Sequence, residues 1–207
     1  MDSMDSFDFK PLEQDKQEEI VERLRSQIEG EDLEAVKRAV IGLGWLEGGD
    51  EFVEPLLKLA TGGSPELAAA ALEGLGRIGS PASEQPLARL VLELFHRDEA
   101  RYAEVRAEAI RVLGKVGGKG STRFLAELIR KQAPASPLDR EAAVEALVSL
   151  ADNGVAGMPE LIEELLAQAA GELKTALQAA SRELNRQEWE DKGFLTIEAD
   201  LKRSEED

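Results

Sequence analysis

The chain has 207 residues, of which 42 are acidic and 25 are basic, so its net charge at neutral pH is −17. It contains no cysteine and one histidine, which excludes disulfides, thiol catalysis and Cys-ligated or His-cluster metal sites within one chain. The charge argues against general nucleic-acid binding, because that affinity comes mainly from neutralising phosphates. The acidic start does not resemble a signal peptide, and no apolar run approaches the about 18 residues of a membrane span. We therefore expect a cytoplasmic protein that needs no cofactor and inserts into no membrane.

The acidic residues gather at the two ends of the chain. Residues 1–35 carry 12 acidic and 4 basic side chains, and residues 183–207 carry 9 and 4. We expect residues 1–14 to be a disordered acidic leader. The segment 15–30 should then form a helix whose apolar stripe includes Leu24 and Ile28, and this helix should cap the domain that follows.

A repeated pattern follows this first helix. The same six-residue pattern occurs at 39–44, 71–76, 109–114 and 146–151: a small residue, an apolar residue, two variable residues, a leucine and a small residue. Segment 176–181 is a weaker copy. Apolar residues around each copy recur at helical spacing, and no run alternates with the period of a strand. The pattern predicts helices at about 15–29, 32–44, 50–60, 64–77, 82–97, 100–116, 120–132, 138–152, 158–169 and 171–188.

Glycines and prolines support these helix boundaries. Gly76 and Gly114 fall where a first helix should stop, and Pro86 and Pro159 fall in or near the first turn of a second helix. The letters Gly74-x-Gly76-x-x-Gly79 match a dinucleotide-binding fingerprint. That fingerprint must follow a strand and open a helix. Here the glycines should end a helix, so we reject nucleotide binding.

One helical hairpin cannot bury both of its apolar faces, so neighbouring hairpins must stack. We expect the repeat domain to occupy residues 31–188 and a C-terminal extension to occupy 189–207. The extension carries Trp189, Phe194, Leu195 and Ile197, which should dock on the last repeat, on a partner or on a second copy. The predicted fold class is all-α, an α-α superhelix.

The core of these repeats resembles that of HEAT repeats, in the short variety of phycobilisome-lyase-type proteins. The resemblance is carried by Arg-Ala-Glu-Ala-Ile-Arg-Val-Leu-Gly-Lys-Val-Gly at 106–117 and by Ala-Ala-Leu-Glu-Gly-Leu-Gly-Arg-Ile-Gly at 70–79, and it covers about residues 32–184. It implies a right-handed solenoid of four to five helical hairpins. It does not specify a function, because the family includes scaffolds, adaptors, chromophore lyases, DNA glycosylases and a metal-dependent hydroxylase.

Two enzymatic branches of this family are disfavoured by the residues present. The hydroxylase branch holds iron with several His-Glu pairs, whereas His96 is followed by Arg97. The glycosylase branch needs a strongly basic groove, which the charge balance opposes. The lyase branch has no short catalytic signature to check, so it stays open.

The resemblance also implies where a partner binds, because second helices of the hairpins usually line the concave surface. On these helices, the residues that do not face the core form a stripe of basic side chains that ends in acidic side chains. Such a surface would suit a polypeptide of matching charge, although mixed charges are also usual on a solvated surface. Trp45 is aligned with polar residues of the other repeats, so it is either an exposed interface anchor or covered by the first helix. The candidate partner-binding residues are Trp45, Lys58, Arg89, Arg123, Glu127, Arg130, Glu163 and Glu164.

These observations favour a non-catalytic scaffold, adaptor or assembly factor that binds another protein. The alternative is a subunit of a bilin lyase or isomerase. We predict no catalytic, cofactor-binding or metal-binding residue, and the partner and the oligomeric state are left open.

Overall fold

The computed structural model describes residues 14–30, 32–43, 49–97, 100–130 and 136–186 of the chain. Every regular element within these ranges is a helix, and none of the described residues lies in a strand. The fold is an all-α helical solenoid, as the sequence predicted. Of the expected leader at 1–14, residues 1–13 lie outside the described residues and Gln14 begins the first helix. The expected extension at 189–207 also lies outside the described residues.

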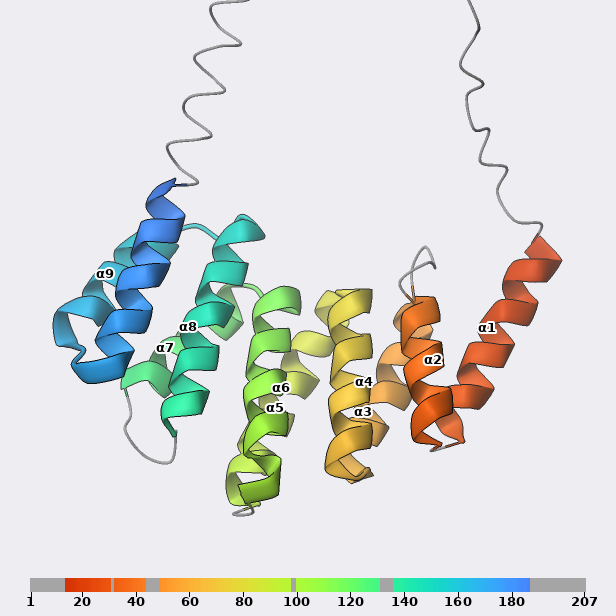
Figure 1. Cartoon of the computed structure of the whole chain (residues 1–207). Helices are drawn as coiled ribbons and strands as arrows, with labels where there is room; N and C mark the ends of the chain where they lie inside the picture. The colour runs from red at the N-terminus through yellow and green to blue at the C-terminus, as the bar shows by residue number, and fades with distance from the viewer. Residues whose placement is uncertain (1–13, 31, 44–48, 98–99, 131–135, 187–207) are drawn as a thin grey trace, which may run out of the picture.

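Successive helices are joined by short connections (Figure 1). Their bounds are α1 Gln14–Glu29, α2 Leu33–Leu43, α3 Val53–Gly62, α4 Pro65–Ile78, α5 Glu84–His96, α6 Ala103–Val116, α7 Lys119–Arg130, α8 Pro137–Asp152 and α9 Met158–Gln168, and a last helix covers 171–186. The predicted starts at 50, 82 and 100 fall in 3₁₀ turns that precede α3, α5 and α6. A 3₁₀ turn tightens the end of a helix and carries the same apolar spacing, so the pattern could not separate the two.

Local capping explains why α4 and α8 begin, and why α4 ends, at these positions. The Ser64 hydroxyl accepts a hydrogen bond from the Leu67 amide at the start of α4, and Ser136 and Asp139 form a reciprocal capping box at the start of α8. Gly79 ends α4 at φ 65°, a conformation that glycine adopts without strain. Gly79 therefore ends α4, whereas Gly74 and Gly76 lie within it and Gly114 lies within α6, so the expectation that Gly76 and Gly114 stop a helix is wrong. The three fingerprint glycines follow a helix and not a strand, which does not fit a dinucleotide site.

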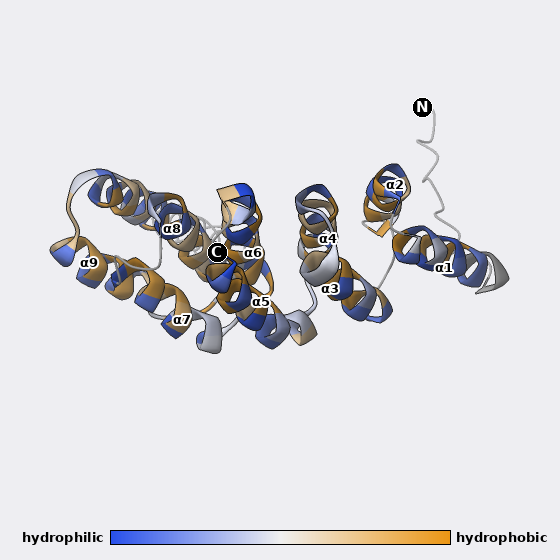
Figure 2. Cartoon of the chain, turned by 90° about the horizontal axis from the view of Figure 1, so that it is seen from below, coloured by the Kyte–Doolittle hydropathy of each residue, from blue (hydrophilic) through white to orange (hydrophobic). Residues whose placement is uncertain are grey.

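The helices form two layers that curve into a shallow arc. Seen from below in Figure 2, α1, α3, α5, α7 and α9 make the outer layer, and α2, α4, α6 and α8 make the inner layer together with the last helix. Neighbouring inner helices lie closer together than neighbouring outer helices do. The arc is therefore concave on the side of the inner layer, which faces the viewer in Figure 1.

Small residues on the inner helices explain the direction of this curvature. A Cβ atom at Gly114 of α6 would lie 2.5 Å from the Cα atom of Ala146 in α8, and one at Gly74 of α4 would lie 3.0–3.2 Å from Leu56 and Val40. Such approaches require glycine or alanine, because a larger side chain would hold the helix backbones apart. The outer helices carry Leu, Val and Ile at their contacts and stay further apart, which bends the stack toward the inner layer.

Helices at both ends cover the apolar faces of the repeats. In α1, Leu24 and Ile28 are buried against the first repeat, and Val21 is half-buried. At the other end, the last helix buries Leu177 and Leu184. These contacts close the two ends of the core, as the terminal units of a solenoid must.

A carboxylate joins the two outer helices α5 and α7. Oε1 of Glu84 accepts hydrogen bonds from the Gly118 and Ser121 amides, both at 3.0 Å, and from the Ser121 hydroxyl at 2.7 Å. Burial raises the pKa of the Glu84 carboxyl, but the hydrogen bonds from Ser121 and Gly118 outweigh this effect and leave the pKa below its usual value. The ionised side chain of one repeat thus caps the first turn of a helix in the next.

Glu84 should make the free energy of unfolding depend on pH. Because its folded-state pKa is lowered, the carboxylate stabilises the fold above its ordinary pKa of about 4.5, and this stabilisation is lost as the pH falls through the lower folded value. We expect Glu84→Gln to lower the free energy of unfolding by about 1 kcal/mol at pH 7, and by much less near pH 3. Urea unfolding at both pH values measures the difference.

The matched control is Glu93→Gln on the same helix, where the side chain is exposed. It should change stability by less than about 0.5 kcal/mol at either pH. An equal loss for Glu84→Gln at both pH values would show that the charge of Glu84 has no stabilising role.

Candidate functional site

A long groove crosses the concave face of the solenoid. It has a volume of about 1330 Å³ and is lined by residues of α2, α4, α6 and the start of α8. Its apolar surface comes from Ile41 of α2, Ala69 and Ala70 of α4, Val105 of α6 and Leu138 of α8. Ile41 is 57% exposed, which is unusual for a large aliphatic side chain in this structure. The groove therefore combines small residues with one exposed aliphatic side chain near its α2 end.

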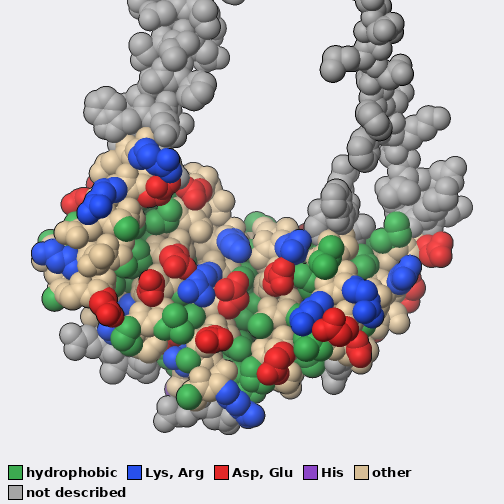
Figure 3. All heavy atoms as spheres, viewed as in Figure 1, with side chains coloured by type: hydrophobic (Ala, Val, Ile, Leu, Met, Phe, Trp, Pro, Cys, Tyr) green, Lys and Arg blue, Asp and Glu red, His purple; other side chains and the backbone are tan. Residues whose placement is uncertain are grey.

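Charged side chains alternate with these apolar residues, as the space-filling view of this face shows (Figure 3). Most of the groove's cations are already paired. Lys37 Nζ lies 3.2 Å from Glu34 Oε1, and Arg77 donates two hydrogen bonds to Glu73. These pairs are exposed, so they contribute little to stability and can exchange partners at low cost.

Arg111 of α6 is shared between two carboxylates. It donates to Glu145 of α8 and to Glu108 of its own helix. Burial lowers the pKa of the Arg111 guanidinium, but the two glutamates outweigh this and raise it, so the charge stays fixed. The pair with Glu145 connects two repeats across the inner layer.

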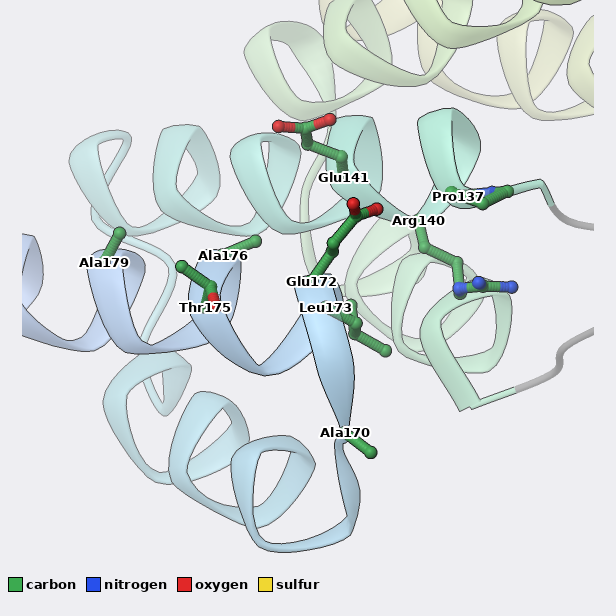
Figure 4. Close-up of a pocket in the computed structure, with 9 residues that line it drawn as sticks. All are labelled: Pro137, Arg140, Glu141, Ala170, Glu172, Leu173, Thr175, Ala176 and Ala179. Atoms are coloured by element: carbon green, nitrogen blue, oxygen red, sulfur yellow. The ribbon is translucent and has the colours of Figure 1, made fainter.

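A second pocket of about 620 Å³ adjoins the end of the inner layer, between α8 and the last helix (Figure 4). Leu173, Ala176 and Ala179 contribute apolar surface from the last helix. The carboxylates of Glu141 and Glu172 extend toward the same side of this pocket. Together with the groove, this pocket makes one concave surface that runs along the repeats.

The predicted binding residues lie elsewhere. The expectation that the second helices of the hairpins line the concave surface is wrong, because α3, α5, α7 and α9 form the outer layer. The described candidates on these helices are Lys58, Arg89, Arg123, Glu127, Arg130, Glu163 and Glu164. The physical reason is the one given above: the smallest residues are on the other layer, and the stack bends toward them. Whether the outer residues bind a partner stays a prediction.

Several of these outer residues make contacts within the chain. Arg130 of α7 donates to Glu164 of α9 at 2.7 Å and lies 3.5 Å from Glu127. Glu163 accepts a hydrogen bond from the Ser181 hydroxyl at 2.6 Å. The predicted acidic end of the stripe thus connects neighbouring helices. Lys58, Arg89 and Arg123 are exposed on three successive outer helices.

Trp45 lies outside the described residues, so neither of its two predicted roles is decided. Lys37 and Ile41 of α2, which the sequence analysis did not select, line the groove. A signal was present in the sequence: Ile41 occupies the position of Glu73 and Arg111 in the later repeats. The fourth repeat also has an apolar residue at this position, Val148, so the signal rests on the charged residues of the second and third repeats alone.

Comparison with known protein families agrees with this architecture. Residues 53–148 match the family model for HEAT repeats. This region consists of HEAT-like repeats. The match begins at α3 and ends within α8, so it spans most of the groove. No curated protein sequence matches the chain significantly.

No described helix combines the length and apolar character that would let it cross a membrane. Among the described side chains, no group of three or more His, Asp or Glu residues is placed to hold a metal ion.

Proposed function

We propose that this protein is a non-catalytic scaffold or adaptor that binds a segment of another protein on the concave face of its HEAT-like solenoid. The observation that carries the proposal is the groove of about 1330 Å³ across α2, α4, α6 and α8. Small-molecule sites are enclosed and usually measure about 300–1000 Å³. A longer surface that crosses several helices is better suited to a polypeptide.

The contacts between repeats support this role, because they keep the groove in one shape before the partner arrives. Arg106 of α6 and Asp139 of α8 form a doubly hydrogen-bonded pair, and Glu84 joins α5 to α7. A surface that needs little ordering loses less conformational entropy on binding. Such a surface suits an adaptor, whose task is to hold a partner in a fixed place.

The negative charge supports a protein partner over a nucleic acid, since an acidic surface repels phosphates. We also propose a cytoplasmic location. The bilin lyase alternative remains an untested prediction from the resemblance of the repeats.

The proposal is tested by comparing partner capture by two variants. The groove variant carries Ile41→Ser and Ala69→Gln, both at exposed positions of the concave face. The outer-layer variant reverses the charges of Lys58, Arg89 and Arg123. Proteins captured from the native host are quantified by mass spectrometry. We expect a specific partner that the outer-layer variant retains and that the groove variant loses by about tenfold or more.

Two results would contradict the proposal. Unchanged capture by the groove variant, with loss in the outer-layer variant, would move the binding site to the sequence-predicted stripe. Uptake of a bilin by the purified chain with a second subunit, seen as a change in absorption, would instead favour the lyase alternative. Circular dichroism of both variants checks that helical content is unchanged.

A further inference from the structure

The dimensions of the groove limit the shape of its occupant, provided that the proposed concave-face binding holds. The groove runs across four neighbouring helices of the inner layer. Packed helix axes lie about 8–10 Å apart, so three steps span about 25–30 Å. A chain in the extended polyproline II conformation advances about 3.1 Å per residue and covers this length in about nine or ten residues.

Carboxylates outnumber cations on this surface. The charged residues of this surface line the groove or the pocket at its end, or form an ion pair with a residue that does. The basic ones are Lys37, Arg77, Arg101, Arg111 and Arg140, and the acidic ones are Glu34, Glu66, Glu73, Glu104, Glu108, Glu141, Glu145 and Glu172. Glu73 and Arg77 neutralise each other, while Arg111 is shared by Glu108 and Glu145. The surface therefore has a surplus of negative charge.

Part of this negative charge is arranged in a regular row, in which Glu34 is paired with Lys37. Glu34, Glu66, Glu104 and Glu141 occupy the same position in four successive inner helices, five residues before the small residue of each repeat motif. All four side chains are exposed. Because the helices lie about 8–10 Å apart, neighbouring carboxylates recur at about the spacing of every third residue of a polyproline II chain, which has three residues per turn and so presents these residues on one face.

The end of the groove at α2 offers an apolar contact in addition to charge. Ile41 is 57% exposed and lies on α2 one turn after Lys37. Covering such a side chain on binding removes apolar surface from water and provides an anchor that charge alone does not. The occupant should therefore present an apolar residue at this end.

We propose that the groove binds an extended, basic polypeptide segment that carries Lys or Arg at about every third residue and an apolar residue over Ile41. Charge complementarity selects this segment over an acidic one, and the row of carboxylates sets its register. The chain's own ends, with their net negative charge, are disfavoured as occupants.

Glu34, Glu66 and Glu104 also stabilise the first turns of their helices, since negative charge there interacts favourably with the positive end of the helix dipole. Stability measurements on their variants therefore do not test the proposal, and a binding measurement is required. The outer helices supply the matched control, because Glu54 of α3 and Glu93 of α5 are exposed and lie outside the groove.

The test measures the affinity of the full chain for three ten-residue peptides by fluorescence anisotropy at low salt. The first peptide has Lys at positions 1, 4, 7 and 10, with Leu and Ser between. The second has the same composition with its four lysines consecutive. The third has Glu in place of Lys. We expect the spaced basic peptide to bind at least tenfold more tightly than the acidic one and several-fold more tightly than the clustered one.

Variants then locate the site. Glu66→Gln with Glu104→Gln should weaken binding of the spaced peptide about tenfold, whereas Glu54→Gln with Glu93→Gln should leave it within about twofold. Equal losses in both double variants would show nonspecific attraction and overturn the proposal. Equal or tighter binding of the acidic peptide, or no binding of any peptide, would overturn it as well. The capture experiment is independent of these peptides, so concave-face binding can stand even when this choice of occupant fails.

Discussion

Replacing Asp139 with alanine should lower the free energy of unfolding by about 3–5 kcal/mol. Asp139 is fully buried, and Arg106 on the neighbouring helix α6 is 11% exposed. The carboxylate accepts two hydrogen bonds from the guanidinium, at 2.8 and 2.9 Å, and one from the Ser136 amide at 2.7 Å. Without it, a nearly buried cation loses its counter-ion and α8 loses part of its capping box.

The size of this effect comes from burial and not from the ion pair as such. The guanidinium of Arg106 also lies 4.7 Å from the centroid of the Phe95 ring, so it is enclosed by α5, α6 and α8. An exposed pair should behave differently. Glu73→Ala removes the partner of Arg77 within α4 and should cost less than about 1 kcal/mol.

Thermal unfolding followed by circular dichroism measures both changes. At about 2–4 °C per kcal/mol for a chain of this size, Asp139→Ala should lower the melting temperature by roughly 6–20 °C. A double variant, Arg106→Met with Asp139→Ala, should recover part of the loss because no unpaired charge remains. Equal effects of Asp139→Ala and Glu73→Ala would show that the buried pair does not connect the repeats energetically.

Replacing Gly114 with alanine should also destabilise the chain, by about 2 kcal/mol or more. Helix propensity alone predicts the opposite sign, because alanine is favoured over glycine by about 1 kcal/mol within a helix. The contact between helices decides the result. The new methyl group would lie 2.5 Å from Cα and 2.6 Å from the carbonyl oxygen of Ala146, and a backbone cannot move aside as a flexible side chain does.

Gly62 provides the control for this substitution. It lies at the end of α3, and a Cβ atom there would have nothing within 4 Å, so Gly62→Ala should be neutral or slightly stabilising. Urea unfolding of both variants measures the difference. If Gly114→Ala proved as stable as the wild type, close packing of α6 on α8 would not be what bends the inner layer.

The local features of the fold were readable from the sequence, because short-range interactions produce them. Ser64-Pro65 and Ser136-Pro137 mark helix starts, and each forms a hydrogen-bonded cap in the structure. The repeated small-apolar motif predicted stacked hairpins, because its spacing repeats one buried helix face four times. These residues determined the all-α solenoid class.

The candidate site could not be predicted in the same way. The sequence contained Lys58, Arg89 and Arg123 on the second helices of successive hairpins, and the family resemblance implied that their layer was concave. The structure places that layer outside. Likewise, the sequence could not show that Arg130 is paired with Glu164, since the two residues meet only after α7 and α9 pack together.

The sequence by itself determined the helices, their caps, their repeat and the acidic charge, each of which depends on composition or on residues within about one turn of one another. Only the tertiary structure decided which layer is concave, and therefore that Ile41, Glu66 and Glu104 line a groove. The physical reason is that curvature depends on a difference between two distances, that between neighbouring inner helices and that between neighbouring outer helices. Each distance is set by side chains about 35 residues apart in the chain, such as Gly114 and Ala146.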